Sequence, residues 1–376
     1  MDSRPALDGV LVADLSRVLA GPTTAMVLGD LGADVIKVES PAGDDTRRWG
    51  PPFDSQGRAA YHHAANRNKR SIALDFADAG DLELARRLCG RADVVIANFR
   101  PGTLERYGLG YDRTAAGNPG VVYCEISGFG EERGRDLPGY DPLVQALGGL
   151  MSVTGTPEQP LKVGVALVDV IAGLYGAIGV LAALRERDRG GTGQRVTINL
   201  LHVTLAGLAN QAAGWLASGL LPERLGNVHP SIEPFATFRA KDGDLMVCAG
   251  NDAQFAALAR VLGVPALASD ERFADNRRRV ANRDALRTAL EGALAARTSR
   301  EWASELGAAG VPAGPVQDVA EAFALAETLG LDVVAETDGV RTVASPVELS
   351  RNPAVLDRRP PDHDEHGAEI RAWLEG

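Results

Sequence analysis

The chain of 376 residues has few cysteines, few aromatic residues and no excess of positive charge. Its three cysteines, Cys89, Cys124 and Cys248, are far apart in apolar stretches, which argues against a disulfide framework and predicts reduced core residues. A net charge of −11 argues against a nucleic-acid-binding protein, because phosphate neutralisation needs a basic surface. The first residues are polar and acidic, so we expect no secretory signal and a cytoplasmic location.

Several signatures of catalysis and cofactor binding are also absent. No G-x-G-x-x-G follows the first predicted strand and no G-x-x-x-x-G-K-[ST] occurs, which argues against a conventionally bound dinucleotide and against a P-loop. No G-x-S-x-G occurs, so a serine hydrolase has no local support. His62 and His63 are adjacent, but no further ligand stands at suitable spacing, and we expect no metal site.

One long apolar run, residues 163–184, contains a single Asp, Asp169. The run is long enough for a transmembrane helix. Asp169 and the glycines at positions 173, 176 and 179 argue against that interpretation. We therefore predict a buried core helix in a soluble protein without a membrane partner.

Asp169 is the first candidate for chemistry. A carboxylate in apolar surroundings is costly unless it is paired, capped or used. A helix is predicted over residues 170–187, so Asp169 stands at or near its N-terminus, where free N–H groups and the helix dipole should keep it ionised. A simple N-cap is the alternative to a carboxylate nucleophile.

The first third of the chain alternates between strands and helices. This alternation predicts an α/β fold with a parallel, doubly wound sheet. The strands are expected at residues 9–15, 34–39, 71–76, 93–99 and 121–130, and the helices at 20–33 and 77–89.

The character of the chain changes after a largely helical stretch, residues 199–221. Two short strands joined by Lys-Asp-Gly within residues 234–250 predict a hairpin, and amphipathic helices follow. We expect the tail, which ends in EHGAEIRAWLEG, to return to the first domain. The predicted organisation is a large Rossmann-like domain at 1–205, a linker at 206–225, a small α+β domain at 226–316, and a linker with the return to the large domain at 317–376.

Three polar loops, residues 16–22, 98–108 and 127–130, follow predicted strands. Ligands of open α/β sheets bind outside the carboxyl ends of the strands. Arg100 and Arg106 lie on the second loop and are suited to holding a phosphate.

The motifs taken together resemble the class III coenzyme A-transferases of the CaiB/BaiF type, which include formyl-CoA and carnitine CoA-transferases and the related acyl-CoA racemases. The resemblance runs in family order from about residue 8 to residue 316. It is carried by DLSRVLAGP, LGDLGADVIKVE, NRNKRSIALD, NFRPGTLERYGLGYD, ISGFG, GYDPLVQALGGLMSVTG, the VD-xxx-G of residues 168–173, GTGQRVTINLL, GN-x-HP and GVPAGPV, with SPVELSRNP and EHGAEI in the tail.

The resemblance implies a role for particular residues. Asp169 matches the catalytic nucleophile, and Tyr140 matches the tyrosine beside the thioester. Ser40 and Pro138 stand where some relatives place basic contacts to CoA. The residues implied in CoA binding are Val18, Leu19, Ala20, Leu74, Asn98, Phe99, Arg100, Arg106 and Tyr140.

The resemblance further implies the reaction and the assembly. CoA would pass from an acyl-CoA to a free carboxylic acid through an aspartyl anhydride and an aspartyl-CoA thioester, with CoA as substrate and no tightly bound cofactor. The subunits would form an interlocked homodimer. The segment NVHPSIEP lacks the glycine run of formyl transferases, which disfavours that specificity. A racemase is the alternative, disfavoured because Tyr140 stands where racemases have His, and a non-catalytic CoA-binding module is a second.

Overall fold

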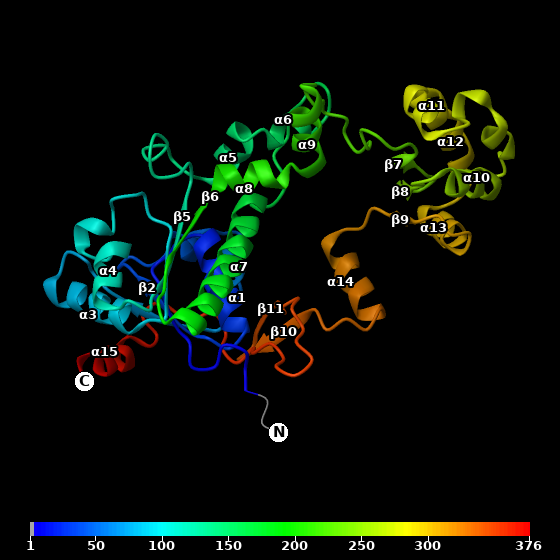
Figure 1. Ribbon diagram of the computed structural model, residues 1–376. Coiled ribbons are helices and arrows are strands. Elements are labelled where there is room, and N and C mark those ends of the chain that lie inside the picture. Colours follow the sequence, from blue (N-terminus) through cyan, green and yellow to red (C-terminus); the bar gives the residue numbers. More distant parts are fainter. Residues whose placement is uncertain (1–3) are drawn as a thin grey trace. The chain divides into compact units, whose positions relative to one another are not determined.

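The computed structural model describes residues 4–376, which form two compact units (Figure 1). The first unit contains residues 4–151, 162–221 and 330–376, and the second contains 152–161 and 222–329.

The second unit is larger than the small domain expected at residues 226–316. Segment 152–161 belongs to it because the backbone N–H of Gly226 donates to the carbonyl oxygen of Gly155 and Arg224 donates to that of Thr156, both at 2.9 Å. Glu321 in the helix beyond residue 316 pairs with Arg300 at 2.8 Å.

A six-stranded parallel sheet forms the centre of the first unit, in the order β3-β2-β1-β4-β5-β6. The predicted α/β class and parallel sheet are confirmed. The edge strand β6 was not predicted: its five residues, RVTIN, alternate between polar and apolar, but with only two apolar positions and no buried run they lack the strong signal of the other strands. The strands are β1 (Leu11–Asp14), β2 (Asp34–Glu39), β3 (Lys69–Ala73), β4 (Val94–Ala97), β5 (Val122–Ser127) and β6 (Arg195–Asn199).

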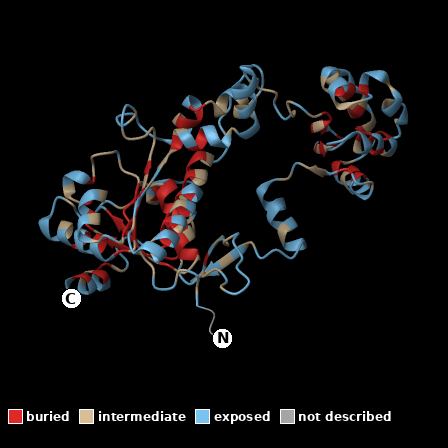
Figure 2. Cartoon of the chain, in the orientation of Figure 1, coloured by how far each residue is buried: buried red, intermediate tan, exposed pale blue. Residues whose placement is uncertain are grey.

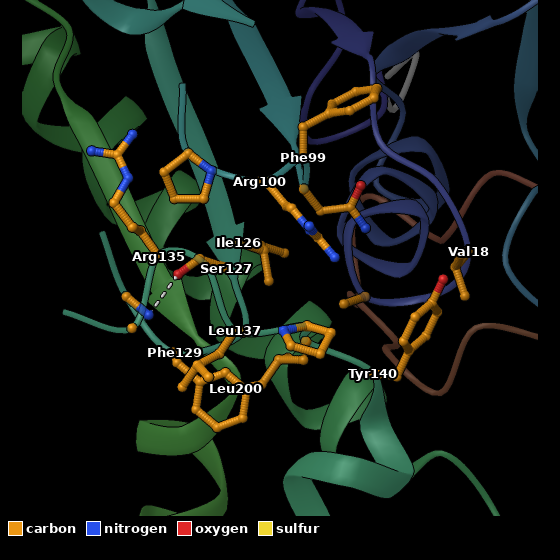
Figure 3. Close-up of a pocket in the computed structure, with 18 of the residues that line it drawn as sticks. Val18, Phe99, Arg100, Ile126, Ser127, Phe129, Arg135, Leu137, Tyr140 and Leu200 are labelled. Carbon is orange, nitrogen blue, oxygen red and sulfur yellow. Dashed lines mark hydrogen bonds between the residues drawn. The ribbon is translucent and has the colours of Figure 1, made fainter. Parts of the chain in front are cut away.

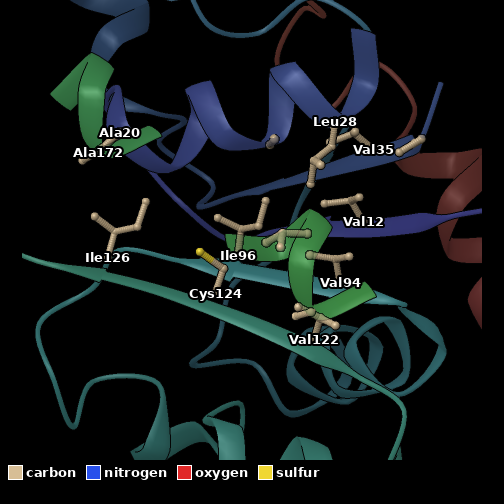
Figure 4. Packing of buried hydrophobic residues seen from close by; sticks show 14 of the residues in the cluster. Val12, Ala20, Leu28, Val35, Val94, Ile96, Val122, Cys124, Ile126 and Ala172 are labelled. Carbon is tan, nitrogen blue, oxygen red and sulfur yellow. The ribbon is translucent and has the colours of Figure 1, made fainter. Parts of the chain in front are cut away.

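Successive strand residues point to opposite faces of the sheet and form two hydrophobic cores. In β1, Val12 packs into one core and Ala13 into the other. Val12 shares the first core with Leu28 of helix α1 (Ala20–Asp30) and Ala172 of helix α7 (Leu167–Gly190) (Figure 4). Ala13 shares the second core with Leu88 of helix α3 (Ala79–Arg91). Both faces are therefore covered by helices, as a parallel sheet requires.

Helix α7 is the helix that the apolar run predicts, and it begins three residues earlier than expected. Among residues 4–376 it is the one helix long and apolar enough to span a membrane, with a mean hydropathy of 2.1, and half of that stretch is buried within the protein. A Cβ on Gly173 would lie 2.8 Å from the carbonyl oxygen of Ala20, and one on Gly176 would lie 2.5 Å from Thr24 Oγ1. The glycines thus allow α7 and α1 to pack closely.

The C-terminal tail belongs to the first unit. Helix α15 (Gly367–Glu375) places Ile370 and Leu374 in the core beneath β3 and α3. The other helical elements of this unit are η1 (Asp45–Arg48), α2 (Ala60–His63), η2 (Glu105–Tyr107), α4 (Tyr111–Gly117), α5 (Asp141–Leu147), α6 (Leu150–Val153, which ends in the second unit), α8 (Leu200–Gly207) and α9 (Ala209–Ser218); β10 (Val334–Thr337) and β11 (Val340–Val343) form a hairpin.

The second unit is built on an antiparallel sheet in the order β7-β8-β9. The predicted hairpin is confirmed as β7 (Phe235–Arg239) and β8 (Asp244–Cys248), whereas the three-residue strand β9 (Ala313–Pro315) is too short to show a periodic pattern. Its helices are α10 (Asp252–Val261), η3 (Pro265–Ser269), η4 (Glu271–Phe273), α11 (Asn276–Ala281), α12 (Arg283–Leu294), α13 (Ser299–Ala308) and α14 (Val319–Thr328).

Candidate active site

A cavity of about 420 Å³ opens at the carboxyl ends of the central strands. Its wall is formed by the loops that follow β1, β4 and β5. Because β1 and β4 are neighbours from which the strand order runs in opposite directions, this is the switch point of the sheet, where open α/β proteins bind their ligands. The topology alone therefore marks this cavity as the candidate site.

The cavity brings together most of the residues singled out in the sequence. In Figure 3 the Arg100 side chain extends toward the middle of the cavity, with Val18 and Tyr140 on one side of it. Tyr140 is 60% exposed and thus free to contact a ligand. The predicted site residues that line the cavity are Val18, Leu19, Ala20, Asn98, Phe99, Arg100, Tyr140 and Asp169, together with Pro138.

Two predicted CoA-binding residues lie elsewhere. Leu74 lines a second cavity of about 230 Å³, which also includes Ser40 and shares Phe99 with the first. Arg106 is exposed on η2 and lines neither cavity.

The loop after β1 is held in an unusual conformation. Val18 has a φ of +67°, a left-handed conformation that is unfavourable for a β-branched residue. Asn98 holds Arg17, the residue before Val18, through two hydrogen bonds. Its Oδ1 accepts from the N–H of Arg17 at 2.8 Å, and its Nδ2 donates to the carbonyl oxygen of Arg17 at 2.7 Å. Asn98 therefore joins the loops after β1 and β4 and shapes the cavity wall.

A cluster of buried charges lies beneath this loop. Lys37 Nζ donates to Asp44 at 2.9 Å and to the carbonyl oxygen of Ser16 at 3.2 Å. Lys69 Nζ donates to Asp14 at 2.9 Å. Burial opposes the charge of Lys37, yet Asp44 and the other nearby carboxylates raise its pKa, whereas burial lowers the pKa of Lys69 to about 8. These pairs fix the strand ends that carry the cavity loops.

Asp169 lies in the first turn of α7 and is buried. Its own backbone N–H donates to Oδ2 of Asp141 at 3.1 Å, and the N–H of Val168 donates to the same oxygen at 2.8 Å. We expected free N–H groups at the helix start to keep Asp169 ionised, and that expectation was wrong. The Asp141 carboxylate occupies those N–H groups.

Burial, and secondly the charge of Asp141, raise the pKa of Asp169 to about 7. A carboxylate with a raised pKa is a stronger base and a stronger nucleophile than an ordinary Asp, and it is still largely ionised just above neutral pH. Among the described residues that line the cavity, Asp169 is the one acid, and three arginines, Arg17, Arg100 and Arg135, provide positive charge. The arrangement is suited to attack on a bound electrophile that carries anionic groups.

Sequence reasoning missed Arg17, Arg135 and Asp141 as parts of the site. Arg17 lies within the loop already singled out, and Asp141 follows Tyr140 directly, so their positions in the motifs were the available signal. Arg135 had no signal, because its loop follows no regular pattern. Within residues 4–376, no group of three or more His, Cys, Asp or Glu is arranged to hold a metal ion.

Comparisons with known proteins show the family. The model of CoA-transferase family III matches residues 7–367. The chain is 43% identical to the succinate–glutarate CoA-transferase of Agrobacterium fabrum, over 99% of this chain and 96% of that protein. It is 41% identical to the acetyl-CoA:oxalate CoA-transferase of Acetobacter aceti, over 97% and 94%.

The fold agrees as well. A crystal structure of a CaiB/BaiF family protein from Brucella suis superposes with a TM-score of 0.90 at 47% identity, covering 98% of this chain and 99% of that one. The match extends over both units. The chain therefore belongs to CoA-transferase family III and is an enzyme that transfers coenzyme A.

Proposed function

We propose that Asp169 is the covalent nucleophile of a CoA transfer from an acyl-CoA to a free carboxylic acid. The observation that carries the proposal is a buried carboxylate with a raised pKa, the one acid among the described residues lining the switch-point cavity. Carboxylate side chains are established covalent catalysts.

The proposed reaction proceeds through two kinds of aspartyl intermediate. An Asp169 oxygen attacks the thioester carbonyl, the C–S bond breaks, and an acyl-aspartyl anhydride and CoA thiolate result. The thiolate attacks the aspartyl carbonyl of the anhydride, which releases the donor acid and leaves an aspartyl-CoA thioester. The acceptor carboxylate then reverses both steps, so the acyl bond energy is kept and no nucleotide is consumed.

The cavity residues divide between the two parts of an acyl-CoA. Val18, Leu19 and Ala20 would contact the pantetheine chain, and Tyr140 would lie beside the thioester. Leu74 in the second cavity would contact the adenine end, since the cavities share Phe99. The remaining proposed CoA contacts are Asn98, Phe99, Arg100 and, for a ligand that extends beyond both cavities, Arg106.

We propose dicarboxylic acids as the substrate class, with succinyl-CoA as a donor. The relatives at 35–43% identity include proteins named for succinate, glutarate, oxalate and mesaconate. The guanidinium groups of Arg17 and Arg100 support this proposal, because the second carboxylate of such an acid needs a positive partner.

The test is CoA transfer from succinyl-CoA to glutarate, oxalate, mesaconate and, as a control, butyrate, followed by mass spectrometry. Transfer to a dicarboxylate that far exceeds transfer to butyrate is the expected result. Deuterium incorporation at the α-carbon of 2-methylacyl-CoA without transfer would instead indicate a racemase.

The covalent role of Asp169 has its own test. With acyl-CoA and hydroxylamine, the wild type should gain a hydroxamate at Asp169. The Asp169→Asn variant should lose several orders of magnitude in rate while still binding CoA. An Asn variant that transfers CoA at the normal rate, with deamidation excluded, would disprove the covalent role.

We also propose an interlocked homodimer. Large apolar side chains are exposed along α7, α8 and α9, including Ile178, Leu205 and Trp215, and Figure 2 shows α14 as largely exposed. Exposed apolar surface of this extent is unusual for a monomer. Sedimentation should give a dimer that persists on dilution, and an active monomer would contradict the proposal.

A cytoplasmic location is proposed as well. Cys89 and Cys124 are buried as free thiols whose pKa is raised to about 12 by burial, and the third cysteine is also unpaired. Free thiols fit a reducing compartment. Fractionation of the native host, with a secreted protein as reference, tests the location.

A further inference from the structure

Helix α7 has no side-chain cap of its own. The residue at its N-cap position is Ala166, which cannot accept a hydrogen bond through its side chain. The cap is provided instead by Asp141 at the start of α5, whose Oδ2 accepts from the N–H groups of Val168 and Asp169. One buried carboxylate is thus bonded directly to the backbone of the proposed nucleophile.

The Asp141 carboxylate is itself held in place. Its Oδ1 accepts from Nε2 of Gln145 at 2.6 Å, and Gln145 Oε1 accepts from the N–H of Val163 at 2.9 Å. Asp141 and Gln145 are both buried. Asp141 therefore has three hydrogen-bond donors, all uncharged, and no ion pair is observed for it within residues 4–376.

The charges around Asp169 come from several elements. Asp141 and Tyr140 lie at the start of α5, and Tyr61 lies on α2, where burial and secondly Asp169 raise the pKa of its phenol. The lining residues from α1, β5 and α8 are uncharged. The cations of the lining, all on loops, are Arg17, Arg100 and Arg135.

We propose that Asp141 is a positioning residue for CoA transfer, which fixes the first turn of α7 and keeps the Asp169 carboxylate in a basic, reactive form. The inference rests on the proposed function of Asp169. A free helix start would stabilise the Asp169 anion through its N–H groups and lower its basicity. Asp141 takes those N–H groups and adds a like charge, which has the opposite effect.

The loss of the N–H donors and the like charge of Asp141 both make the Asp169 carboxylate more reactive. An anion that receives few hydrogen bonds and faces a second anion has a high ground-state energy. Attack on the thioester carbonyl spreads that charge onto the acyl oxygen and the leaving sulfur, so the repulsion from Asp141 is relieved in the transition state. Interactions that differ between ground and transition state are those that change kcat.

Asp141→Asn tests the proposal, because the Asn Oδ1 can still accept from both N–H groups while the charge is lost. The measurement is kcat/KM for succinyl-CoA against pH at saturating glutarate, since this ratio follows the ionisation of the free enzyme. For the wild type we expect the acid limb near pH 7. The variant should move that limb down by about one pH unit or more. The plateau rate should fall about threefold for each unit, if the carboxylate follows the Brønsted slope of about 0.5 that thiolate nucleophiles show.

Two further variants separate charge from structure. Asp141→Ser also lacks the charge and keeps a polar side chain at this position, so it should move the acid limb in the same direction if Asp141→Asn does not fold. Gln145→Met is the matched control, because it removes a hydrogen bond from the same carboxylate and leaves its charge. Gln145→Met should lower the melting temperature without moving the limb. A limb that is unmoved in both Asp141 variants, or that moves equally in Gln145→Met, overturns the proposal.

The result separates this inference from the proposed function. If Asp169→Asn transfers CoA normally, the covalent role of Asp169 fails, whatever the Asp141 variants do. If Asp169 is trapped as the hydroxamate and is essential, but the Asp141 variants keep the wild-type limb, only the role of Asp141 fails.

Discussion

The backbone N–H of Val18 donates to Asp44, with 3.2 Å between the nitrogen and Oδ2, and this bond ties a strained residue of the cavity wall to a buried carboxylate. Asp44 also accepts from Lys37 Nζ, from the N–H of Thr46 and from the hydroxyl of Thr46. The conformation of the loop therefore depends on a charge pair inside the protein.

Removal of Lys37 should loosen this loop. In Lys37→Met the Asp44 charge stays buried without its cation, which costs about 3–5 kcal/mol of stability in comparable cases. We expect a lower urea midpoint and a higher KM for acyl-CoA. Arg300→Met is the control, since its pair with Glu321 is exposed and surface pairs contribute about 0–1 kcal/mol. Normal stability and KM in Lys37→Met would contradict this role.

Asp169 should make the protein less stable at high pH. Its folded pKa, about 7, lies above the ordinary Asp value of 3.8, so the folded state binds the proton more tightly and stability falls as pH rises from about 4 to about 7. Asp169→Asn removes this penalty. Its gain at pH 8 should reach up to about 4 kcal/mol, from about three pKa units at about 1.4 kcal/mol each.

Urea denaturation of Asp169→Asn and the wild type at pH 4, 6 and 8 checks this prediction. The difference between them should be small at pH 4 and grow toward pH 8. The exposed Asp112→Asn serves as a control for loss of one negative charge away from the cavity. A difference that is constant with pH would rule out the raised pKa.

Glu39 should have the opposite effect on folding stability. It should stabilise the protein at neutral pH, and this contribution should be lost in acid. Although burial opposes it, hydrogen bonds and charge from Arg47, with Lys37, lower the pKa of Glu39 to about 2 from 4.5. Its contribution is complete above pH 4.5 and is lost as the pH falls through 2. Glu39→Gln should therefore be less stable than the wild type at pH 7, and the two should converge near pH 2. Denaturation midpoints that stay separated in acid would refute this assignment.

The contact between α7 and α1 should tolerate no side chain at Gly173. A Cβ there meets Thr23 Cβ at 2.7 Å and the carbonyl oxygen of Ala20 at 2.8 Å, so Gly173→Ala should destabilise the protein by about 1–3 kcal/mol despite the better helix propensity of Ala. Gly190→Ala, at the other end of α7, has no atom within 4 Å of the new Cβ and should be neutral or slightly stabilising. Thermal melting of both variants is the measurement. Equal melting temperatures would show that the helices can separate without cost.

The sequence predicted the parts of the fold that depend on local pattern. The alternation of buried strands with helices predicted the parallel sheet, and the carboxyl ends of those strands placed Val18, Asn98 and Arg100 together. The strand β6 was missed because it is an edge strand of five residues with no buried run, and its two apolar residues give too short an alternation to stand out.

The raised pKa of Asp169 could not be predicted from the sequence around it. Its pKa depends on how completely packing removes water and on Asp141, 28 residues away along the chain. No pattern within one helix shows which N–H groups a distant carboxylate will occupy.

The outer edge of strand β3 can be covered only after the C-terminal tail has been synthesised. The N–H of Ala73 in β3 donates to Asp364, and the N–H of His366 donates to the carbonyl oxygen of Ser71, across 291 and 295 residues. At ribosomal rates of about 5–20 residues per second, the outer edge of β3 waits roughly 15–60 s for these partners. An uncovered edge strand is a template for pairing with another chain. The nascent polypeptide thus carries an unpaired strand edge from the synthesis of β3 until the tail has been made, and a chain truncated before Asp364 would keep that edge exposed.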